Sequence, residues 1–336
     1  MVNILITGGT GFIGVPLVEK LYELGHSIKL IVRESSDISP FQNFNNLEYI
    51  YGDVRDIESL HKAVDNVDII YHLAAYTRMW AQDESVFEDI NIKGTENVAK
   101  VAMKNDIRLI YVSSFIALGA TPEEPVDETF ESRDGLFLDY AKTKLEAKKL
   151  IKDYIDKGLN AVMFYPGIAY GPRDFNIFGQ TILDITSESF MGCPGKGDNV
   201  GSFVYVYDIA NGLTSIIEKN DLRGEEFILG GENMLFNDWL NSIADISGSD
   251  KKVRHFPMSL ALLYGWLCEL KTKFTKKMPY INRPTIKMIN YNWSYSSEKA
   301  IKELGYKITP LKEGLTQTIE WYKDFIEAKR LKKKRN

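Results

Sequence analysis

A tyrosine and a lysine, Tyr140 and Lys144, lie four residues apart in the sequence, which puts both side chains on one face of a helix. A nearby ammonium group favours phenolate over phenol. It therefore lowers the tyrosine pKa toward neutral pH, where the group can exchange a proton with a substrate oxygen. On its own the pair has an ordinary alternative, because the same spacing is common on exposed helices.

Two serines, Ser113 and Ser114, end an apolar run that begins at Leu109. If this run is a strand of a parallel sheet, the serines lie at the carboxyl edge, where ligands of open α/β sheets bind. A serine hydroxyl there can donate a hydrogen bond to a reacting oxygen while a nicotinamide cofactor carries the hydride. Together with Tyr140 and Lys144, the serines predict oxidation of an alcohol or reduction of a carbonyl group.

A glycine-rich segment, TGGTGFIG over residues 7–14, separates the first apolar run from a helical pattern. The glycines permit a tight turn, close approach of a pyrophosphate and close packing of helix on strand. The N-terminus of the following helix presents its amides to the anion. A bare structural turn is the alternative, but the order of strand, glycines and helix favours a dinucleotide. The expected contacts are Gly8, Thr10, Gly11, Phe12, Ile13 and Gly14.

The residues after the next two apolar runs bear on the choice of cofactor. Arg33 stands where an acidic side chain would bind the ribose 2′-hydroxyl of NAD. A guanidinium suits a 2′-phosphate, so we expect NADP(H) to be preferred over NAD(H), although Glu34 adds an opposing charge and a solvated arginine is the alternative. Asp53 is expected to accept a hydrogen bond from the adenine amino group, or else to cap a helix.

A parallel sheet would bring these residues to one edge. Six apolar runs predict its strands, at residues 3–7, 27–32, 47–51, 69–73, 109–113 and 161–165. Helical patterns alternate with them at residues 14–24, 57–64, 85–105 and 139–157. The alternation predicts an α/β fold with a doubly wound parallel sheet of the Rossmann type. His72 is interpreted as a packed residue at the end of the fourth strand, followed by the cofactor-contacting segment Leu73, Ala74 and Ala75.

The second half of the chain changes to loops rich in glycine, proline and aromatic residues, before helical patterns resume at residues 208–219, 236–246, 259–273, 297–304 and 311–329. We expect a Rossmann domain of residues 1–165 with residues 201–230. A smaller, mostly helical substrate-binding lobe would comprise residues 166–200 and 231–328, with a basic tail at 329–336. The loops of this half are expected to line a cleft.

The composition excludes several classes of protein. A chain of 336 residues with 44% hydrophobic residues can bury a large core, and its net charge of -5 argues against nucleic acid as the main partner. A small molecule suits it better. Two cysteines, Cys193 and Cys268, are too few for a disulfide framework or a zinc cluster, so we expect no metal site and a reducing, cytoplasmic location.

One segment has a different character. Residues 258–270 form an apolar helical pattern containing Trp266, several lysines follow it, and the chain ends in the basic run KRLKKKR. This combination suits a weak contact with an anionic membrane surface. The alternative is an ordinary helix of the lobe with a solvated basic tail.

The motifs TGGTGFIG, GDVRD, HLAA, NIKGTENV, YVSS, YAKTK and YPGIAYGP follow one another in order. Through them the sequence resembles the extended branch of the short-chain dehydrogenase/reductase superfamily over nearly its whole length. The resemblance implies that Tyr140 is the general acid or base, that Lys144 binds the nicotinamide ribose and lowers the tyrosine pKa, and that Ser114 rather than Ser113 polarises the carbonyl. It places Asn91 at the family's structural and active-site asparagine. It also implies a homodimer and cofactor contacts from Val54, Ser113, Tyr165, Pro166, Gly167 and Ile168.

Within this branch the sequence is most similar to dihydroflavonol reductase-like and 3β-hydroxysteroid dehydrogenase-like proteins, through Arg33, YTRMW after HLAA and the closing segment from NWSYSSEKA to TIEWY. Several of these proteins act on hydrophobic ketones or alcohols. Nucleotide-sugar epimerases and dehydratases, the alternative, usually carry an acidic residue after strand two. A non-catalytic cofactor-binding protein is a second alternative, against which the intact Ser114, Tyr140 and Lys144 argue.

Aromatic residues and a scarcity of cations in the expected cleft favour an apolar substrate over a diphosphate sugar. Individually, most such aromatic residues belong to a core. The expected substrate contacts are Tyr76, Arg78, Trp80, Phe115, Tyr170 and Arg173.

Overall fold

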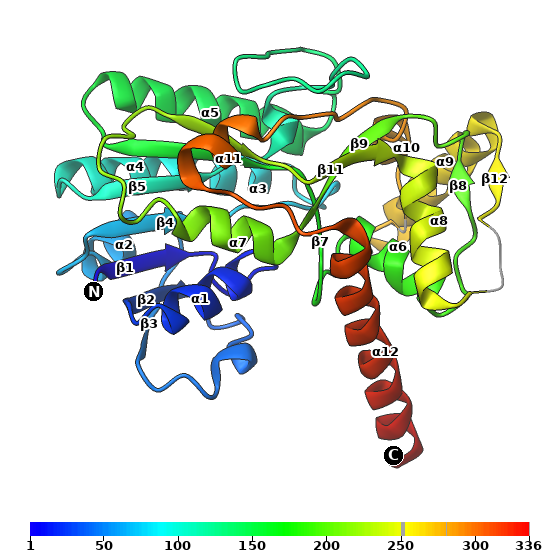
Figure 1. The fold of residues 1–336 in the computed structure, drawn as a ribbon, viewed down its shortest axis with the longest axis horizontal. Coiled ribbons are helices and arrows are strands. Elements are labelled where there is room, and N and C mark those ends of the chain that lie inside the picture. Colours follow the sequence, from blue (N-terminus) through cyan, green and yellow to red (C-terminus); the bar gives the residue numbers. More distant parts are fainter. Residues whose placement is uncertain (250–252, 280, 336) are drawn as a thin grey trace.

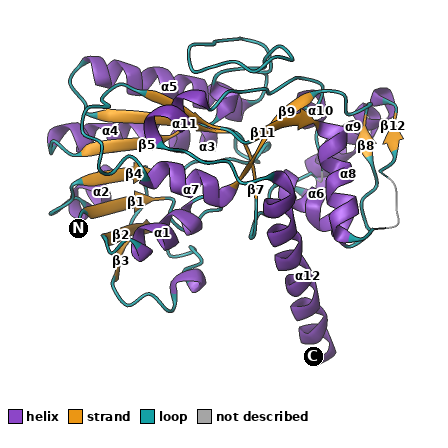
Figure 2. Ribbon diagram, in the orientation of Figure 1, coloured by secondary structure: helices purple, strands orange, loops and turns teal. Residues whose placement is uncertain are grey.

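A parallel sheet forms the centre of the computed structural model, which describes residues 1–249, 253–279 and 281–335 (Figures 1 and 2). Its order is β10-β6-β5-β4-β1-β2-β3, and every adjacent pair is parallel. The order reverses between β1 and β4, so a ligand crevice is expected outside their carboxyl ends. The predicted doubly wound sheet is confirmed. Its strands are β1 (Asn3–Thr7), β2 (Ser27–Val32), β3 (Leu47–Tyr51), β4 (Ile69–His72), β5 (Arg108–Val112), β6 (Ala161–Pro166) and β10 (Glu226–Leu229).

Alternate strand residues bury against helices on both faces of this sheet, which is why the strands read as continuous apolar runs. Ile4 and Ile6 face one hydrophobic cluster and Leu5 faces the other. On the first face pack α1 (Gly14–Glu23), α7 (Val206–Thr214) and α11 (Glu298–Leu304), and on the second pack α2 (Ile57–Ala63), α4 (Thr95–Lys104) and α5 (Asp139–Asp156). The crossovers thereby leave the carboxyl edge of the sheet open for the site.

The helix predicted over residues 85–105 is broken into three parts. A short α3 (Ser85–Glu88) leads into a π-helical segment, η2 (Asp89–Gly94), before α4 begins. Gly94 is needed in this segment, because a Cβ there would lie 2.7 Å from a methyl group of Val54. The wider turn is of the kind often found at functional sites, and it contains the buried Asn91.

The remaining elements gather mainly at one end of the molecule (Figure 1). A three-stranded sheet comprises β7 (Ile168–Tyr170), β9 (Val200–Tyr205) and β11 (Glu232–Leu235), and β8 (Cys193–Pro194) pairs with β12 (His255–Phe256). Two short 3-10 turns are η1 (Ser39–Phe41) and η3 (Phe115–Ala117). The further helices are α6 (Ile177–Thr186), α8 (Phe236–Ser247), α9 (Met258–Thr275), α10 (Arg283–Met288) and α12 (Leu311–Arg335).

Aromatic packing holds this end together. Phe203 of β9 stacks on Trp239 of α8 with ring centroids 4.7 Å apart, and Phe178 of α6 meets both rings edge-on. Helix α12 continues through the basic residues at the end of the chain to Arg335. Among the described helices, none combines the length and the apolar character needed to cross a bilayer.

Candidate active site

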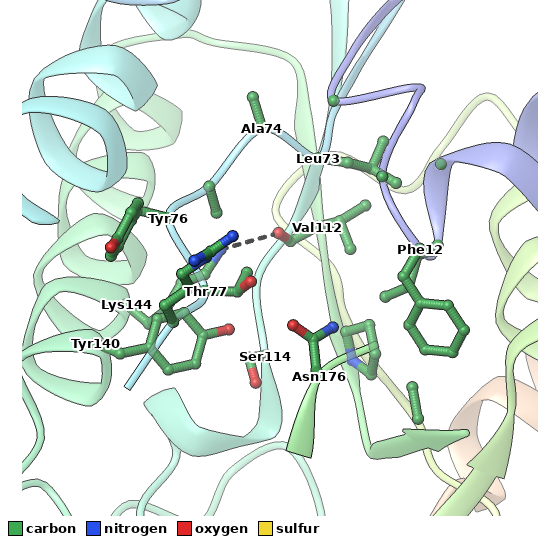
Figure 3. Close-up of a pocket in the computed structure, with 18 of the residues that line it drawn as sticks. Phe12, Leu73, Ala74, Tyr76, Thr77, Val112, Ser114, Tyr140, Lys144 and Asn176 are labelled. Atoms are coloured by element: carbon green, nitrogen blue, oxygen red, sulfur yellow. Dashed lines mark hydrogen bonds between the residues drawn. The ribbon is translucent and has the colours of Figure 1, made fainter. Parts of the chain in front are cut away.

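A cavity of about 650 Å³ lies at the carboxyl edge of the central sheet (Figure 3). The loops that follow β1 to β6 all contribute to its wall, as the doubly wound topology requires. Most of the expected site residues line it, namely Gly8, Thr10, Gly11, Phe12, Ile13, Gly14, Arg33, Asp53, Val54, Leu73, Ala74, Ala75, Tyr76, Arg78, Ser113, Ser114, Phe115, Tyr140, Lys144, Pro166, Gly167 and Ile168.

Five of the expected residues lie outside this lining, namely Asn91, Trp80, Tyr165, Tyr170 and Arg173. Tyr165 is fully buried, with its hydroxyl hydrogen-bonded to a glutamate of β10. Tyr170 is also buried and packs against another tyrosine ring. Arg173 is exposed, and Trp80 contributes its backbone carbonyl to a hydrogen bond from Tyr76. Sequence order alone did not separate the wall of the cavity from the core behind it.

The glycine turn is shaped for close approach of another backbone. Gly8 has φ +78, and a Cβ on it would lie 2.6 Å from the backbone nitrogen of Ala74. A Cβ on Gly14 would lie 2.3 Å from the carbonyl oxygen of Gly8. The first turn of α1 contains no acidic residue, so its amides can meet an anion. This cradle, which any side chain would fill, fits the pyrophosphate of a dinucleotide.

Arg33, Ser36 and Asp53 line the part of the cavity that follows β2 and β3. The Arg33 amide donates to the Ser36 hydroxyl at 3.0 Å. Arg55 holds the Asp53 carboxylate through two hydrogen bonds of 2.9 Å, and this contact lowers the pKa of Asp53. The alternative of a capping role for Asp53 is not supported, because Asp56 caps α2. Asp53 is thus an ionised acceptor at the cavity wall.

Tyr140 and Ser114 project into the cavity from α5 and from the end of β5 (Figure 3). Burial raises the pKa of Tyr140 to about 12, and hydrogen bonding to Ser114 opposes the rise. Burial also lowers the pKa of Lys144 to about 8. In the protein alone, burial therefore shifts the pKa of Tyr140 in the direction opposite to the one expected from the ammonium group, because a desolvated site disfavours the phenolate. The phenol of Tyr140 keeps its proton at neutral pH.

Asn91 acts behind the wall of the cavity. Its Oδ1 accepts a hydrogen bond of 2.7 Å from the Tyr76 amide, and its Nδ2 donates to the Tyr76 carbonyl at 3.1 Å. The same Nδ2 donates to the Thr143 hydroxyl at 3.0 Å. Asn91 thereby ties the loop after β4 to the helix that carries Tyr140. It is a positioning residue, which agrees with the structural half of its expected role.

A buried hydrogen-bond chain that the sequence did not reveal supports the same wall. His72 lies 2.7 Å from Thr7 Oγ1 through Nδ1 and 2.9 Å from Thr95 Oγ1 through Nε2. The Thr95 hydroxyl gives its one proton to the Asn91 carbonyl, so it can only accept a hydrogen bond from the Nε2–H group of His72. The other ring nitrogen of His72, Nδ1, is then unprotonated and accepts a hydrogen bond from the Thr7 hydroxyl. Burial lowers the pKa of His72 to about 3, which keeps it neutral. Its interpretation as a packed residue fits this geometry.

The other end of the cavity is largely apolar. Besides Phe115, its wall includes Met79, Ile177, Phe178 and Met288. Met79 and Met288 were not among the expected contacts, because nothing local in the sequence shows that α10 meets the loop after β4. The charged side chains on this part of the wall are Arg78 and Asp174. Burial raises the pKa of Asp174 to about 6, although the amides of Asn176 and Gly179 bind its carboxylate.

Comparison with known proteins gives consistent matches over most of the chain. The model of the NAD dependent epimerase/dehydratase family matches residues 4–230. A Synechocystis sp. protein, whose name assigns it provisionally as a dihydroflavonol 4-reductase, is 28% identical over 95% of this chain and 94% of its own. Sterol demethylase protein B of Methylococcus capsulatus is 26% identical over 95% of this chain and 98% of its own. The crystal structure of gox2253 matches with a TM-score of 0.82 and 31% identity, covering 97% of this chain and 99% of that one.

Proposed function

The chain belongs to the NAD-dependent epimerase/dehydratase family of extended short-chain dehydrogenases/reductases, and from this premise we propose that it is an NADP(H)-dependent oxidoreductase that interconverts a ketone and a secondary alcohol of an apolar small molecule. One observation carries the proposal. The hydroxyl groups of Ser114 and Tyr140 and the ammonium group of Lys144 line the same cavity as the glycine turn.

The chain's own residues would divide the chemistry as follows. A bound nicotinamide cofactor supplies or accepts the hydride. Ser114 donates a hydrogen bond to the substrate oxygen, and Tyr140 gives its proton to that oxygen during reduction or removes it during oxidation. The raised pKa of Tyr140 keeps the proton available for reduction. Lys144 would hold the ribose hydroxyls and stabilise the phenolate once Tyr140 has given up its proton.

The preference for NADP(H) is supported by the charge around the adenine end of the cavity. Arg33 and Ser36 offer a guanidinium and a hydroxyl group to a 2′-phosphate. Asp53 is already engaged by Arg55, so its negative charge is partly neutralised. We infer that a 2′-phosphate meets net attraction here.

The apolar class of substrate is supported by the wall beyond Tyr140. Met79, Phe178 and Met288 line it, and the charged side chains on this part of the wall are Arg78 and Asp174, one of each sign. A diphosphate sugar would call for more than one cation to offset its charge. The names of the two curated relatives refer to a dihydroflavonol and to a sterol, both largely apolar molecules.

Net turnover of the cofactor tests this proposal against a sugar epimerase or dehydratase. We expect one NADPH to be oxidised for each steroid or flavonoid ketone reduced. Isomerisation of UDP-glucose without net turnover of cofactor would overturn the proposal and favour the epimerase alternative. Binding of NADPH without turnover of either class would favour a non-catalytic cofactor-binding protein.

Two further features remain predictions. The family resemblance implies a homodimer formed through α5, which light scattering in solution would test. The two cysteines are free, with Cys193 buried, and a reducing cytoplasmic location is in keeping with them.

A further inference from the structure

Helix α9 packs with its small residues inward and its large residues outward. Its buried positions are Ala261, Gly265 and Thr272. Gly265 permits close contact with α10, since a Cβ there would lie 2.8 Å from Ile286 Cδ1. An ordinary helix at a protein surface buries its large apolar side chains instead. The packing of α9 thus leaves its most hydrophobic side chains toward solvent.

We call these outward side chains, together with Met278 just beyond the helix, the α9 face. Phe274 is 82% exposed, Leu260 56% and Trp266 44%. Exposed apolar patches of this kind mark interaction sites in soluble proteins. The α9 face comprises Leu260, Leu263, Tyr264, Trp266, Leu267, Leu270, Phe274 and Met278.

The charged side chains at the C-terminal end of the α9 face are mainly positive. Four exposed lysines follow or flank its C-terminal end, namely Lys271, Lys273, Lys276 and Lys277. The acidic residue of α9, Glu269, is paired with Arg283 at 2.7 Å. This local positive charge occurs in a chain whose net charge is -5. It is therefore a local feature and not a reflection of overall composition.

The α9 face adjoins the wall of the cavity. Arg78 lines the cavity, and its Nη1 lies 3.6 Å from the sulfur of Met278. Met79 also lines the cavity, and its carbonyl accepts a hydrogen bond of 2.9 Å from Asn282, the residue that caps α10. Met288 at the end of α10 contributes to the same wall. A molecule that covers the α9 face would thus sit next to the apolar end of the site.

We propose that the α9 face docks on an anionic lipid bilayer, with α9 lying along the interface and its lysines contacting lipid headgroups. Apolar residues on one side of a helix with flanking lysines are the features of such interfacial helices. A second copy of the chain, packed through the same face, would bring the lysine cluster against its own equivalent, which charge disfavours. Docking would place the cavity beside the bilayer, and this last point rests on the proposed apolar substrate.

Co-sedimentation with lipid vesicles tests the proposal. We expect the wild-type protein to bind vesicles of phosphatidylcholine and phosphatidylglycerol at least about tenfold more tightly than vesicles of phosphatidylcholine alone, and high salt to remove the difference. Equal binding to both vesicles, or binding to neither, would overturn the proposal without need of any variant.

Matched variants locate the contact. Leu263→Ser with Leu267→Ser should weaken binding to the anionic vesicles at least about tenfold, whereas Leu24→Ser with Ile301→Ser, at 56% and 46% exposure elsewhere, should not. Vesicle binding should weaken to a similar extent when four lysines are replaced by Gln, namely Lys271, Lys273, Lys276 and Lys277. It should not weaken when four exposed lysines elsewhere are replaced, namely Lys104, Lys302, Lys307 and Lys312. If the target and control variants lost vesicle affinity equally, the α9 face would not be the site of contact.

The remaining outcomes separate docking from catalysis. If the wild-type protein is a dimer that Leu263→Ser with Leu267→Ser converts to a monomer, the α9 face is an interface between copies, and the bilayer proposal is overturned. Turnover of a water-soluble ketone, measured without vesicles, tests the proposed function separately. Turnover without vesicle binding overturns docking alone, and vesicle binding without turnover of any ketone overturns the proposed function alone.

Discussion

Lys144 Nζ donates a hydrogen bond of 3.4 Å to the backbone carbonyl of Val112, so the ammonium group is held against the last residue of β5, two positions before Ser114 (Figure 3). It also lies over the ring of Tyr111, 5.4 Å from the centroid. These neighbours do not offset the burial of the charge, which lowers the pKa of Lys144 to about 8. Lys144 is therefore placed for function at a cost in stability.

Replacing Lys144 by Met should stabilise the ligand-free protein at neutral pH. The pKa of Lys144 is about 8 in the folded protein, and its reference value is 10.5. Lys144 therefore lowers the free energy of unfolding by its full amount below pH 8, and by less and less as the pH rises to 10.5. The gain at pH 7 is at most about 3 kcal/mol. Urea unfolding at pH 7 and pH 10 measures it.

The matched control is Lys142→Met on the same helix. Lys142 is exposed and pairs with Asp139 at the surface, so its loss should change the free energy of unfolding by no more than about 0.5 kcal/mol. A loss of stability in the Lys144→Met variant at pH 7 would show that its hydrogen bond outweighs its burial.

Replacing Tyr140 by Phe should remove turnover but spare the cofactor. Loss of a general acid costs about 10² to 10⁴ in kcat, whereas the glycine turn that would bind the cofactor is untouched, so the NADPH dissociation constant should stay within about twofold. Steady-state kinetics and calorimetry measure the two quantities. Tyr154→Phe is the control, since Tyr154 lies on the same helix and bonds to Glu96. Retention of full activity by Tyr140→Phe would refute the catalytic assignment.

Most of the strands were predictable because they are buried on both faces, the edge strand β3 being the exception. The limits predicted for β1, β2 and β3 agree with the structure, those of β4 and β6 differ by one residue at one end, and β5 is shifted by one residue at both ends. A strand covered on both sides must be apolar throughout, and the hydroxyl and glycine residues that follow must then lie at one edge. Local sequence therefore predicted six strands of the central sheet and the hydroxyl and glycine residues at its edge, but not the seventh strand, β10.

The site residues that were not predicted owe their positions to contacts between segments far apart in the sequence. The chain from Thr7 through His72 to Thr95 joins three elements whose spacing in sequence gives no pattern. Met288 reaches the cavity only because α10 packs against the loop after β4. The rise in the pKa of Tyr140 likewise has no local signal, because the burial that causes it is a property of the folded chain.

Replacing Arg33 by Ala should reduce the preference for NADPH over NADH. A charge-assisted hydrogen bond to the 2′-phosphate is worth about 1.5 to 3 kcal/mol, so NADPH should bind about 10 to 100 times more weakly, while NADH, which lacks the phosphate, should change little. Calorimetric titration with both cofactors measures this. Arg223→Ala serves as control, because Arg223 precedes β10 at the opposite edge of the sheet. Equal weakening for both cofactors would refute the role of Arg33.

Replacing His72 by Gln should make the protein more resistant to acid. Burial lowers the pKa of His72 from 6.5 to about 3, so above pH 6.5 the residue is neutral in both states and contributes no pH dependence. Below pH 6.5 the unfolded chain binds a proton at His72 that the folded chain does not bind, and the free energy of unfolding falls by about 3 kcal/mol between pH 6.5 and pH 4.

Gln can donate to Thr95 and accept from Thr7, but it does not titrate. The difference in unfolding free energy between wild type and variant should therefore narrow or reverse as the pH falls. Thr95→Val breaks the same hydrogen-bond chain but keeps the histidine. It should be less stable than wild type at pH 7 and should still lose stability between pH 6.5 and pH 4. If His72→Gln lost as much stability over this pH range as wild type, groups other than His72 would be the cause.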